Sequence, residues 1–133
     1  MDKKIFYPLY ETTVFEDFRI MTENVANRYP DRVGIAYKKQ PTDKEVTEIT
    51  YAQAREYIRH FGTELVAMGC REKHVALIGE SSPEWIFSYF ALMSIGAVVI
   101  PIDRELPPSD MKDILNRSES EYVIYNVSIH DKI

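Results

Sequence analysis

Few residues of this chain have side chains that could do chemistry, and those residues are scattered. The three histidines, His60, His74 and His130, are far apart in the sequence and have no catalytic or metal-binding company. The single cysteine, Cys70, has no partner for a disulfide, and it follows a predicted helix C-terminus. The partial negative charge there raises the pKa of a thiol, so we expect an inert cysteine. We therefore expect these four residues to have packing or surface roles.

The loop at residues 79–85 places serines and carboxylates directly after a predicted strand and before a helix, where open α/β sheets bind ligands. It contains neither G-x-G-x-x-G nor G-x-x-x-x-G-K-(S/T), and Glu80 would repel an anion. No G-x-S-x-G elbow surrounds Ser81 or Ser82, which argues against a nucleophile. We therefore favour a structural interpretation, in which Ser82 caps the helix and Trp85 packs into the core, over a ligand site.

Two carboxylates, Asp103 and Glu105, flank Arg104 just after another predicted strand. Such a pair can serve as general acid and base when a pocket desolvates it and moves the two pKa values apart. The sequence gives no sign of that pocket, so an ordinary acidic loop is the favoured interpretation. We predict no catalytic residue, no cofactor-binding residue and no metal site in the chain.

Composition narrows the class of protein further. The 133 residues contain 21 acidic and 16 basic side chains, a net charge of −5 that disfavours a nucleic-acid partner. Residues 85–102 carry no charge and approach the roughly 20 residues that cross a bilayer. However, Pro83 and Gly96 punctuate this stretch as a helix followed by a strand, so we predict no transmembrane segment. The N-terminus lacks a signal peptide, and a cytoplasmic location is expected.

The first half of the chain predicts a helix, a hairpin and a second helix. Apolar residues at helical spacing indicate an amphipathic helix over about residues 13–28. Strand-like runs at 33–37 and 46–49 flank a polar turn. Thr50 and Gln53 have the spacing of a capping box. The helix that follows ends at Gly69, and its apolar face consists of Ala54, Ile58, Phe61, Leu65 and Met68.

The second half alternates strands at 74–79, 97–101 and 121–126 with helices at 83–95 and 108–118. Strands separated by helices of ten or more residues indicate right-handed crossovers and a parallel sheet. The strands are apolar without alternation, as parallel strands covered on both faces require. The predicted fold class is therefore α/β: a parallel sheet with flanking helices, preceded by a helix and a β-hairpin.

Three segments resemble motifs of the AMP-forming acyl-CoA synthetases, in family order and at family spacing. Residues 48–54 resemble the I/L-S/T-Y-x-E-L/F segment, 74–85 the V-A-I/L-x-x-E/D-N-x-P-E-W stretch of long-chain fatty acid–CoA ligases, and 91–103 the A-x-x-x-x-G-A-x-x-V-P-L/I-D/N/Y motif. Gln53 and Ser81 depart from the usual acidic residue and asparagine, which affects the subfamily more than the superfamily. The matching positions, mainly structural, are Thr50, Tyr51, Glu80, Ser81, Pro83, Glu84, Trp85, Gly96, Pro101 and Asp103.

The resemblance implies a parent enzyme that activates a carboxylic acid, expected to be a fatty acid, with ATP and magnesium and then passes the acyl group to coenzyme A. It also implies that the ATP, magnesium and catalytic motifs of the family lie beyond Ile133. We therefore expect a non-catalytic fragment, a single partial domain over residues 1–133 with a tail at 127–133. Its expected partners are the rest of the synthetase and, for the fragment alone, a second copy paired through strand residues such as Val123 and Tyr125.

Two other functions remain open from the sequence. The chain could be a stand-alone interaction module that offers an uncovered face to a protein partner. Alternatively, it could belong to an amino-acid-activating adenylation domain, although residues 83–85 favour the acyl-CoA ligase branch. A reading frame that continues into a Ser/Thr/Gly-rich loop would distinguish the fragment from the module.

Overall fold

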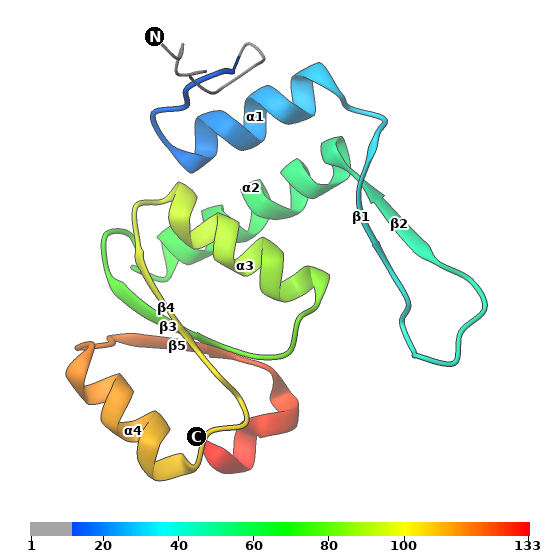
Figure 1. The fold of residues 1–133 in the computed structure, drawn as a ribbon. Helices are drawn as coiled ribbons and strands as arrows, with labels where there is room; N and C mark the ends of the chain where they lie inside the picture. Colours follow the sequence, from blue (N-terminus) through cyan, green and yellow to red (C-terminus); the bar gives the residue numbers. More distant parts are fainter. Residues whose placement is uncertain (1–11) are drawn as a thin grey trace, which may run out of the picture.

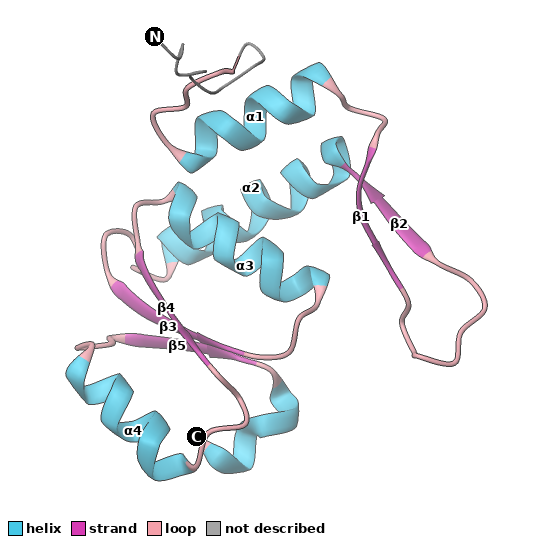
Figure 2. Cartoon of the chain, in the orientation of Figure 1, coloured by secondary structure: helices cyan, strands magenta, loops and turns pink. Residues whose placement is uncertain are grey.

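The computed structural model describes residues 12–133 and contains a three-stranded parallel sheet with helices on both faces and a hairpin beside it (Figure 1, Figure 2). In chain order the elements are α1 (Phe18–Arg28), β1 (Val33–Tyr37), β2 (Thr47–Thr50), α2 (Tyr51–Ala67), β3 (His74–Ile78), α3 (Pro83–Ser94), β4 (Val98–Ile102), α4 (Pro108–Arg117), β5 (Tyr122–Tyr125) and the 3₁₀ helix η1 (Val127–Lys132). The predicted fold class and every predicted helix and strand are confirmed, with shifts at their ends.

The parallel sheet has the strand order β4-β3-β5, so the chain places β4 on one side of β3 and then crosses over to place β5 on the other. Val75 lies opposite Val99 of β4 and Tyr122 of β5, and both ladders are parallel. Because β3 is the central strand, its residues from Val75 to Ile78 are all buried. The helical crossovers inferred from the sequence therefore produce the sheet that is observed.

Helices cover the two faces of the sheet with separate hydrophobic clusters (Figure 1). Val75 points to the face covered by α2 and α3, in a cluster with Leu65 and Leu92. Ala76, the next residue of β3, points to the opposite face, where Met111 of α4 and Ile129 of η1 pack. Residues 127–132, expected as a tail, thus form η1 and bury the side chain of Ile129.

Helix α1 begins later than the sequence pattern indicates. Its N-terminal residue is Phe18, because the carboxylate of Asp17 accepts a hydrogen bond of 2.7 Å from the Ile20 amide and caps the helix there. Val14, which the pattern placed on the apolar face, lies before the helix and is 91% exposed. Spacing alone extended the predicted helix by more than one turn, whereas a side-chain cap fixes its real start.

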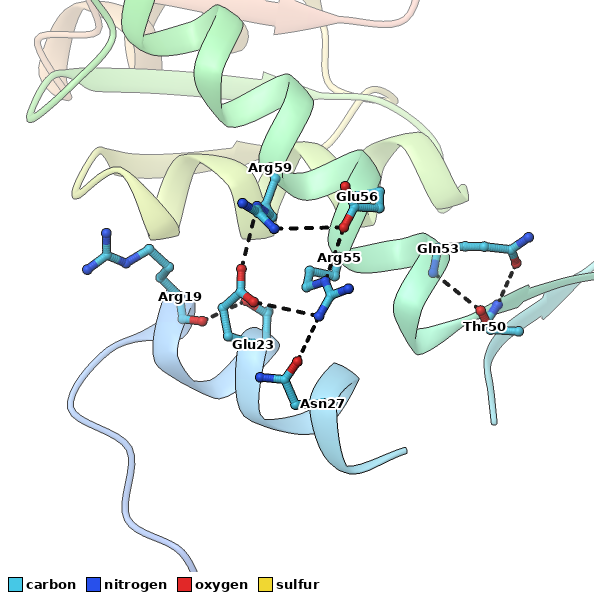
Figure 3. Close-up of polar contacts among 9 residues, drawn as sticks. Arg19, Glu23, Asn27, Thr50, Gln53, Arg55, Glu56 and Arg59 are labelled. Atoms are coloured by element: carbon cyan, nitrogen blue, oxygen red, sulfur yellow. Dashed lines mark hydrogen bonds and ion pairs between the residues drawn. The ribbon is translucent and has the colours of Figure 1, made fainter. Parts of the chain in front are cut away.

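Glu23 joins α1 to α2 through a surface network (Figure 3). Its carboxylate lies 3.8 Å from Arg55 Nη1 and 3.7 Å from Arg59 Nε, and Arg55 also donates a 2.8 Å hydrogen bond to Asn27. Because these side chains are partly or largely exposed, the ion pairs add little stability. The network therefore fixes orientation more than it stabilises the packing of α1 on α2.

The predicted capping box of α2 is confirmed (Figure 3). The backbone N–H of Gln53 donates to Thr50 Oγ1 at 3.3 Å, and the backbone N–H of Thr50 donates to Gln53 Oε1 at 2.9 Å. The apolar face is confirmed in part: Leu65 is 1% exposed, but Met68, placed on the same face by its spacing, is 63% exposed. Met68 is the C-terminal cap of α2, where the chain turns toward Gly69 and leaves the helical face.

Removing the cap should destabilise the chain measurably. We expect Thr50→Ala to lower the free energy of unfolding by about 0.5–2 kcal/mol, because the N-terminal amides of α2 lose an acceptor. Thr63→Ala is the matched control, since the Thr63 hydroxyl contacts only the Arg59 carbonyl of its own helix. Urea denaturation followed by circular dichroism measures both. Equal midpoints for the two variants would contradict the role of the cap.

Candidate functional site

A small crevice opens at the carboxyl ends of β3 and β5, beside the first turn of α3. Its volume is about 90 Å³. The connection after β3 leads into α3 on one face of the sheet, and the connection after β5 leads into η1 on the other. Such a divergence is where open α/β sheets bind ligands. The lining includes Gly79, Glu80, Ser82, Glu84, Trp85 and Asn126.

Gly79 keeps this crevice open at its base. A Cβ atom at position 79 would lie 3.3 Å from Cδ1 of Trp85 and 3.9 Å from Cβ of Asn126. The Asn126 side chain is held in place because its Oδ1 accepts a 2.9 Å hydrogen bond from the Ser128 amide. The crevice therefore depends on a glycine after β3 and on an asparagine after β5. Sequence reasoning missed Asn126, because only the pairing of β5 with β3 brings it next to this loop.

The first turn of α3 confirms one structural prediction and corrects another. Ser82 Oγ accepts a 3.2 Å hydrogen bond from the Trp85 amide, so Ser82 caps the helix as predicted. Trp85, predicted to be largely buried, is only partly buried and stacks on Tyr89, with ring centres 5.5 Å apart. Neither ring belongs to the core cluster, whereas Phe87, Ala91 and Leu92 do. Because Trp85 is only partly buried, it contributes less hydrophobic stabilisation than a fully buried tryptophan would.

The loops after β3 and β4 are joined by an ion pair. Arg104 Nη1 lies 3.0 Å from Glu80 Oε2, and Arg104 Nε lies 3.0 Å from Glu105. Asp103 Oδ1 accepts a 2.9 Å hydrogen bond from the Glu105 amide, and Lys132 Nζ donates to the Arg104 carbonyl at 3.1 Å. Asp103 and Glu105 are exposed and turn-bound, as the structural interpretation predicted. This arrangement therefore holds the loops after β3 and β4 together.

The ten positions that match family motifs do not form one site. The loop after β3 gathers Glu80, Ser81, Pro83, Glu84 and Trp85, and Arg104 connects Asp103 of the next loop to it. Pro101 lies within β4, opposite Leu77. Gly96 follows α3 with a φ of 78°, a conformation that favours glycine. Thr50 and Tyr51 begin α2, where the Tyr51 ring lies against Gly34 of β1.

None of the histidines nor the cysteine lines the crevice, although His130 contacts Tyr125, which does. His74 Nδ1 is 2.6 Å from the Ser118 carbonyl, His130 Nδ1 is 2.7 Å from the Tyr125 hydroxyl, and His60 is exposed. Within residues 12–133, no three His, Cys, Asp or Glu side chains gather as metal ligands would. Cys70 is buried, and this burial raises the pKa of its thiol, which adds a cause to the one inferred from the sequence.

One lysine has a perturbed titration at the start of the sheet. The Lys73 ammonium lies 2.8 Å from Glu121, and the hydrogen bond to this carboxylate, followed by its charge, raises the pKa of Lys73 above its ordinary value. Because Lys73 precedes β3 and Glu121 precedes β5, the pair aligns the amino ends of two neighbouring strands. It lies at the end of the sheet opposite the crevice.

A second, larger hollow of about 820 Å³ lies between α1, α2 and the C-terminal end of α3. Its floor is apolar and includes Ile58 and Met93, and its rim carries three arginines and three carboxylates: Arg19, Arg59, Arg71, Asp17, Glu23 and Glu72. The balanced rim selects neither anions nor cations. No helix within the described residues is long and apolar enough to cross a membrane.

An open α/β sheet with a capped, proline-initiated helix after its central strand defines the class of this protein, and comparison with known proteins identifies the family. The model of the AMP-binding enzyme family matches residues 22–132. The chain therefore belongs to the AMP-binding enzyme family, as its motifs predicted.

Curated relatives include CoA ligases and subunits of the mycosubtilin and linear gramicidin synthases. The chain is 26% identical over 126 residues to the crotonobetaine/carnitine–CoA ligase of Proteus mirabilis, a match that covers 88% of the chain and 24% of the relative. It is 27% identical over 124 residues to a mycosubtilin synthase protein of Bacillus subtilis, covering 92% of the chain and 4% of that protein. The chain thus spans about a quarter of the CoA ligase and a small part of the synthase.

Solved structures have the same fold. The N-terminal subdomain of Klebsiella oxytoca NpsA superposes with a TM-score of 0.75 at 24% identity, covering 85% of this chain and 28% of that one. The inhibitor-bound N-terminal domain of FACL13 from Mycobacterium tuberculosis gives a TM-score of 0.73 at 26% identity, covering 88% and 29%. Both structures share the fold of this chain, and both are N-terminal portions of their proteins.

Proposed function

We propose that this chain is the N-terminal portion of an acid–thiol ligase, an ATP-dependent acyl-CoA synthetase. The parent enzyme joins a carboxylate to ATP, forming an acyl-adenylate and releasing pyrophosphate, and then transfers the acyl group to the thiol of coenzyme A, releasing AMP. The observation that carries the proposal is the family match over residues 22–132. The Pro83-Glu84-Trp85 turn at the start of α3 supports the ligase branch, and we propose a fatty acid as the substrate.

The parent activity requires ATP, magnesium and coenzyme A, and the residues of the crevice do not fit the phosphate groups of ATP. A polyphosphate needs converging amides and a cation, whereas Glu80 and Glu84 bring carboxylates to the helix N-terminus and the lining contains no lysine. We therefore route no step of the reaction through this chain. Its proposed role is structural: the sheet and its helices support the later parts of a synthetase, its partner in the same polypeptide.

The proposal concerns a cytoplasmic enzyme. The lone cysteine, Cys70, is buried and unpaired, which suits a reducing compartment. For the isolated chain, we further propose association with a second copy through the outer edge of β5. Neither the cytoplasmic location nor the self-association depends on the reaction of the parent enzyme.

We expect the 133-residue chain to form no acyl-adenylate, because no loop among its described residues presents converging amides with a lysine. A protein that joins this chain to the rest of its synthetase should exchange pyrophosphate into ATP in the presence of a fatty acid. The assay compares both proteins with fatty acids, betaine-type acids and amino acids, and mass spectrometry detects CoA thioesters. Exchange that scales with the purified chain and survives repurification would overturn the assignment of a non-catalytic role.

The alternative substrate class is an amino acid, and the match to the mycosubtilin synthase protein favours keeping it in the panel. Exchange by the longer protein with amino acids alone, and no CoA thioester, would replace the ligase proposal with an adenylation domain. A stand-alone interaction module predicts a different outcome: the reading frame lacks a Ser/Thr/Gly-rich loop, and no carboxylic acid supports exchange.

A further inference from the structure

Two arginines share the ring of one tyrosine at the junction of α1 and β1. The guanidinium carbon of Arg32 lies 4.6 Å from the centre of the Tyr29 ring, and that of Arg28 lies 5.3 Å from the same centre. The two carbons are therefore at most 9.9 Å apart, the sum of these distances. A ring with a negative face attracts each cation, which holds two like charges near one another.

The backbone fixes this arrangement at the first turn of α2. The Arg32 amide donates to the Tyr29 carbonyl at 3.2 Å, which closes the turn between the helix and β1. The Tyr51 amide donates to the Arg32 carbonyl at 3.0 Å, and the Ala52 amide donates to the Pro30 carbonyl at 3.1 Å. Residues 30–32, which include Arg32, are thus tied to the start of α2 by two hydrogen bonds, and Arg28 is the last residue of α1.

The electrostatics around the pair favour an anion. Within residues 12–133, neither Arg28 nor Arg32 lies within 4.0 Å of a carboxylate, although Asp31 is between them in the sequence. The first turn of α2 has no acidic residue, and its N-terminus carries a partial positive charge. Both arginines are exposed, so this is a local cationic patch on a chain with a net charge of −5.

We propose that Arg28 and Arg32 bind a phosphate or diphosphate group of a small molecule. Each guanidinium can give two parallel hydrogen bonds of about 2.8 Å to phosphate oxygens, and a dianion between the arginines relieves their mutual repulsion. The Tyr29 ring holds both guanidinium carbons within 5.3 Å of its centre. The patch lies at the α1–α2 junction and not in the crevice, and it does not rest on the proposed ligase activity.

The test is a titration of the isotope-labelled 133-residue chain with sodium pyrophosphate at constant ionic strength, followed by NMR of backbone amides and arginine Nε–H groups. We expect saturable shifts at Tyr29 and Arg32. The double variant Arg28→Gln/Arg32→Gln should weaken binding about tenfold or more, because charge-assisted hydrogen bonds are lost. Arg28→Lys/Arg32→Lys keeps the charge without the planar fork and should fall between the two.

The matched control is Arg71→Gln/Arg117→Gln, which removes the same charge from exposed sites elsewhere. Its affinity for pyrophosphate should stay within about twofold, since distant surface charges are screened. Equal losses in both double variants, or shifts that never saturate, would show unspecific attraction and overturn the proposal. Dispersed amide signals verify folding, and the single variant Arg28→Gln replaces a double variant that does not fold.

Two further arms identify the source of the anion. ADP that binds at least as tightly as pyrophosphate, with added shifts at Tyr29, indicates a nucleotide. ADP that binds more weakly indicates a free phosphate or diphosphate, which supports the same site. Acetate that competes as well as pyrophosphate at equal ionic strength would mean that any anion suffices, and the phosphate assignment would be wrong.

Discussion

Replacing Leu65 by alanine is expected to lower the free energy of unfolding by about 2–5 kcal/mol, because it leaves a cavity in the core. Leu65 is 1% exposed and packs between α2 and the sheet, in the cluster that contains Val75 and Leu92. Met68→Ala is the matched variant at the C-terminal cap of the same helix, since Met68 is 63% exposed. We expect it to change stability by no more than about 0.5 kcal/mol.

Urea denaturation followed by the fluorescence of Trp85, the single tryptophan, measures both variants. The midpoint of Leu65→Ala should fall while the slope stays constant, because the surface exposed on unfolding is nearly unchanged. A Leu65→Ala chain that is already unfolded without urea would also agree with this prediction, because the loss of stability would then exceed the stability of the chain. Equal shifts for the two variants would mean that the core does not reach this part of α2 in the way the packing indicates.

The isolated chain is expected to self-associate through β5. The outer edges of β4 and β5 are both unpaired within residues 12–133, but they differ in chemistry. Pro101 in β4 has no backbone N–H and weakens that edge as a template, whereas β5 contains no proline. A second copy can therefore add its β5 most simply about a two-fold axis, since such a contact closes itself.

Light scattering at several concentrations should show a mass that rises from monomer to dimer. Tyr125→Lys places a charge in β5 and should shift the rise to concentrations about tenfold higher, as lysines in edge strands oppose pairing. Because Tyr125 packs against the cluster of Met111 and Ile129, circular dichroism must show that the variant remains folded. Val98→Lys is the control on β4, where the native side chain is 48% exposed. A monomer mass at every concentration, or equal effects of the two lysines, would contradict association through β5.

Some features could be predicted because neighbouring residues alone decide them. Thr50 and Gln53 form their capping box, and Ser82 caps α3, because each bond joins groups three residues apart. The apolar runs of β3, β4 and β5, with helices between them, indicated the parallel pairing that is observed. The family followed from the same local motifs, which the match over residues 22–132 bears out.

The tertiary structure decided what depends on residues distant in the sequence. Leu65 and Met68 both fit the helical spacing of the predicted apolar face. Only the packing of the helix shows that Leu65 is buried and that Met68 is exposed. The Glu80–Arg104 pair and the approach of Asn126 to Gly79 exist because β4 and β5 flank β3. Trp85 borders the crevice instead of filling the core for the same reason. Sequence determined the elements and their caps, while strand order determined which side chains meet, because burial and long-range contact arise only when the layers pack.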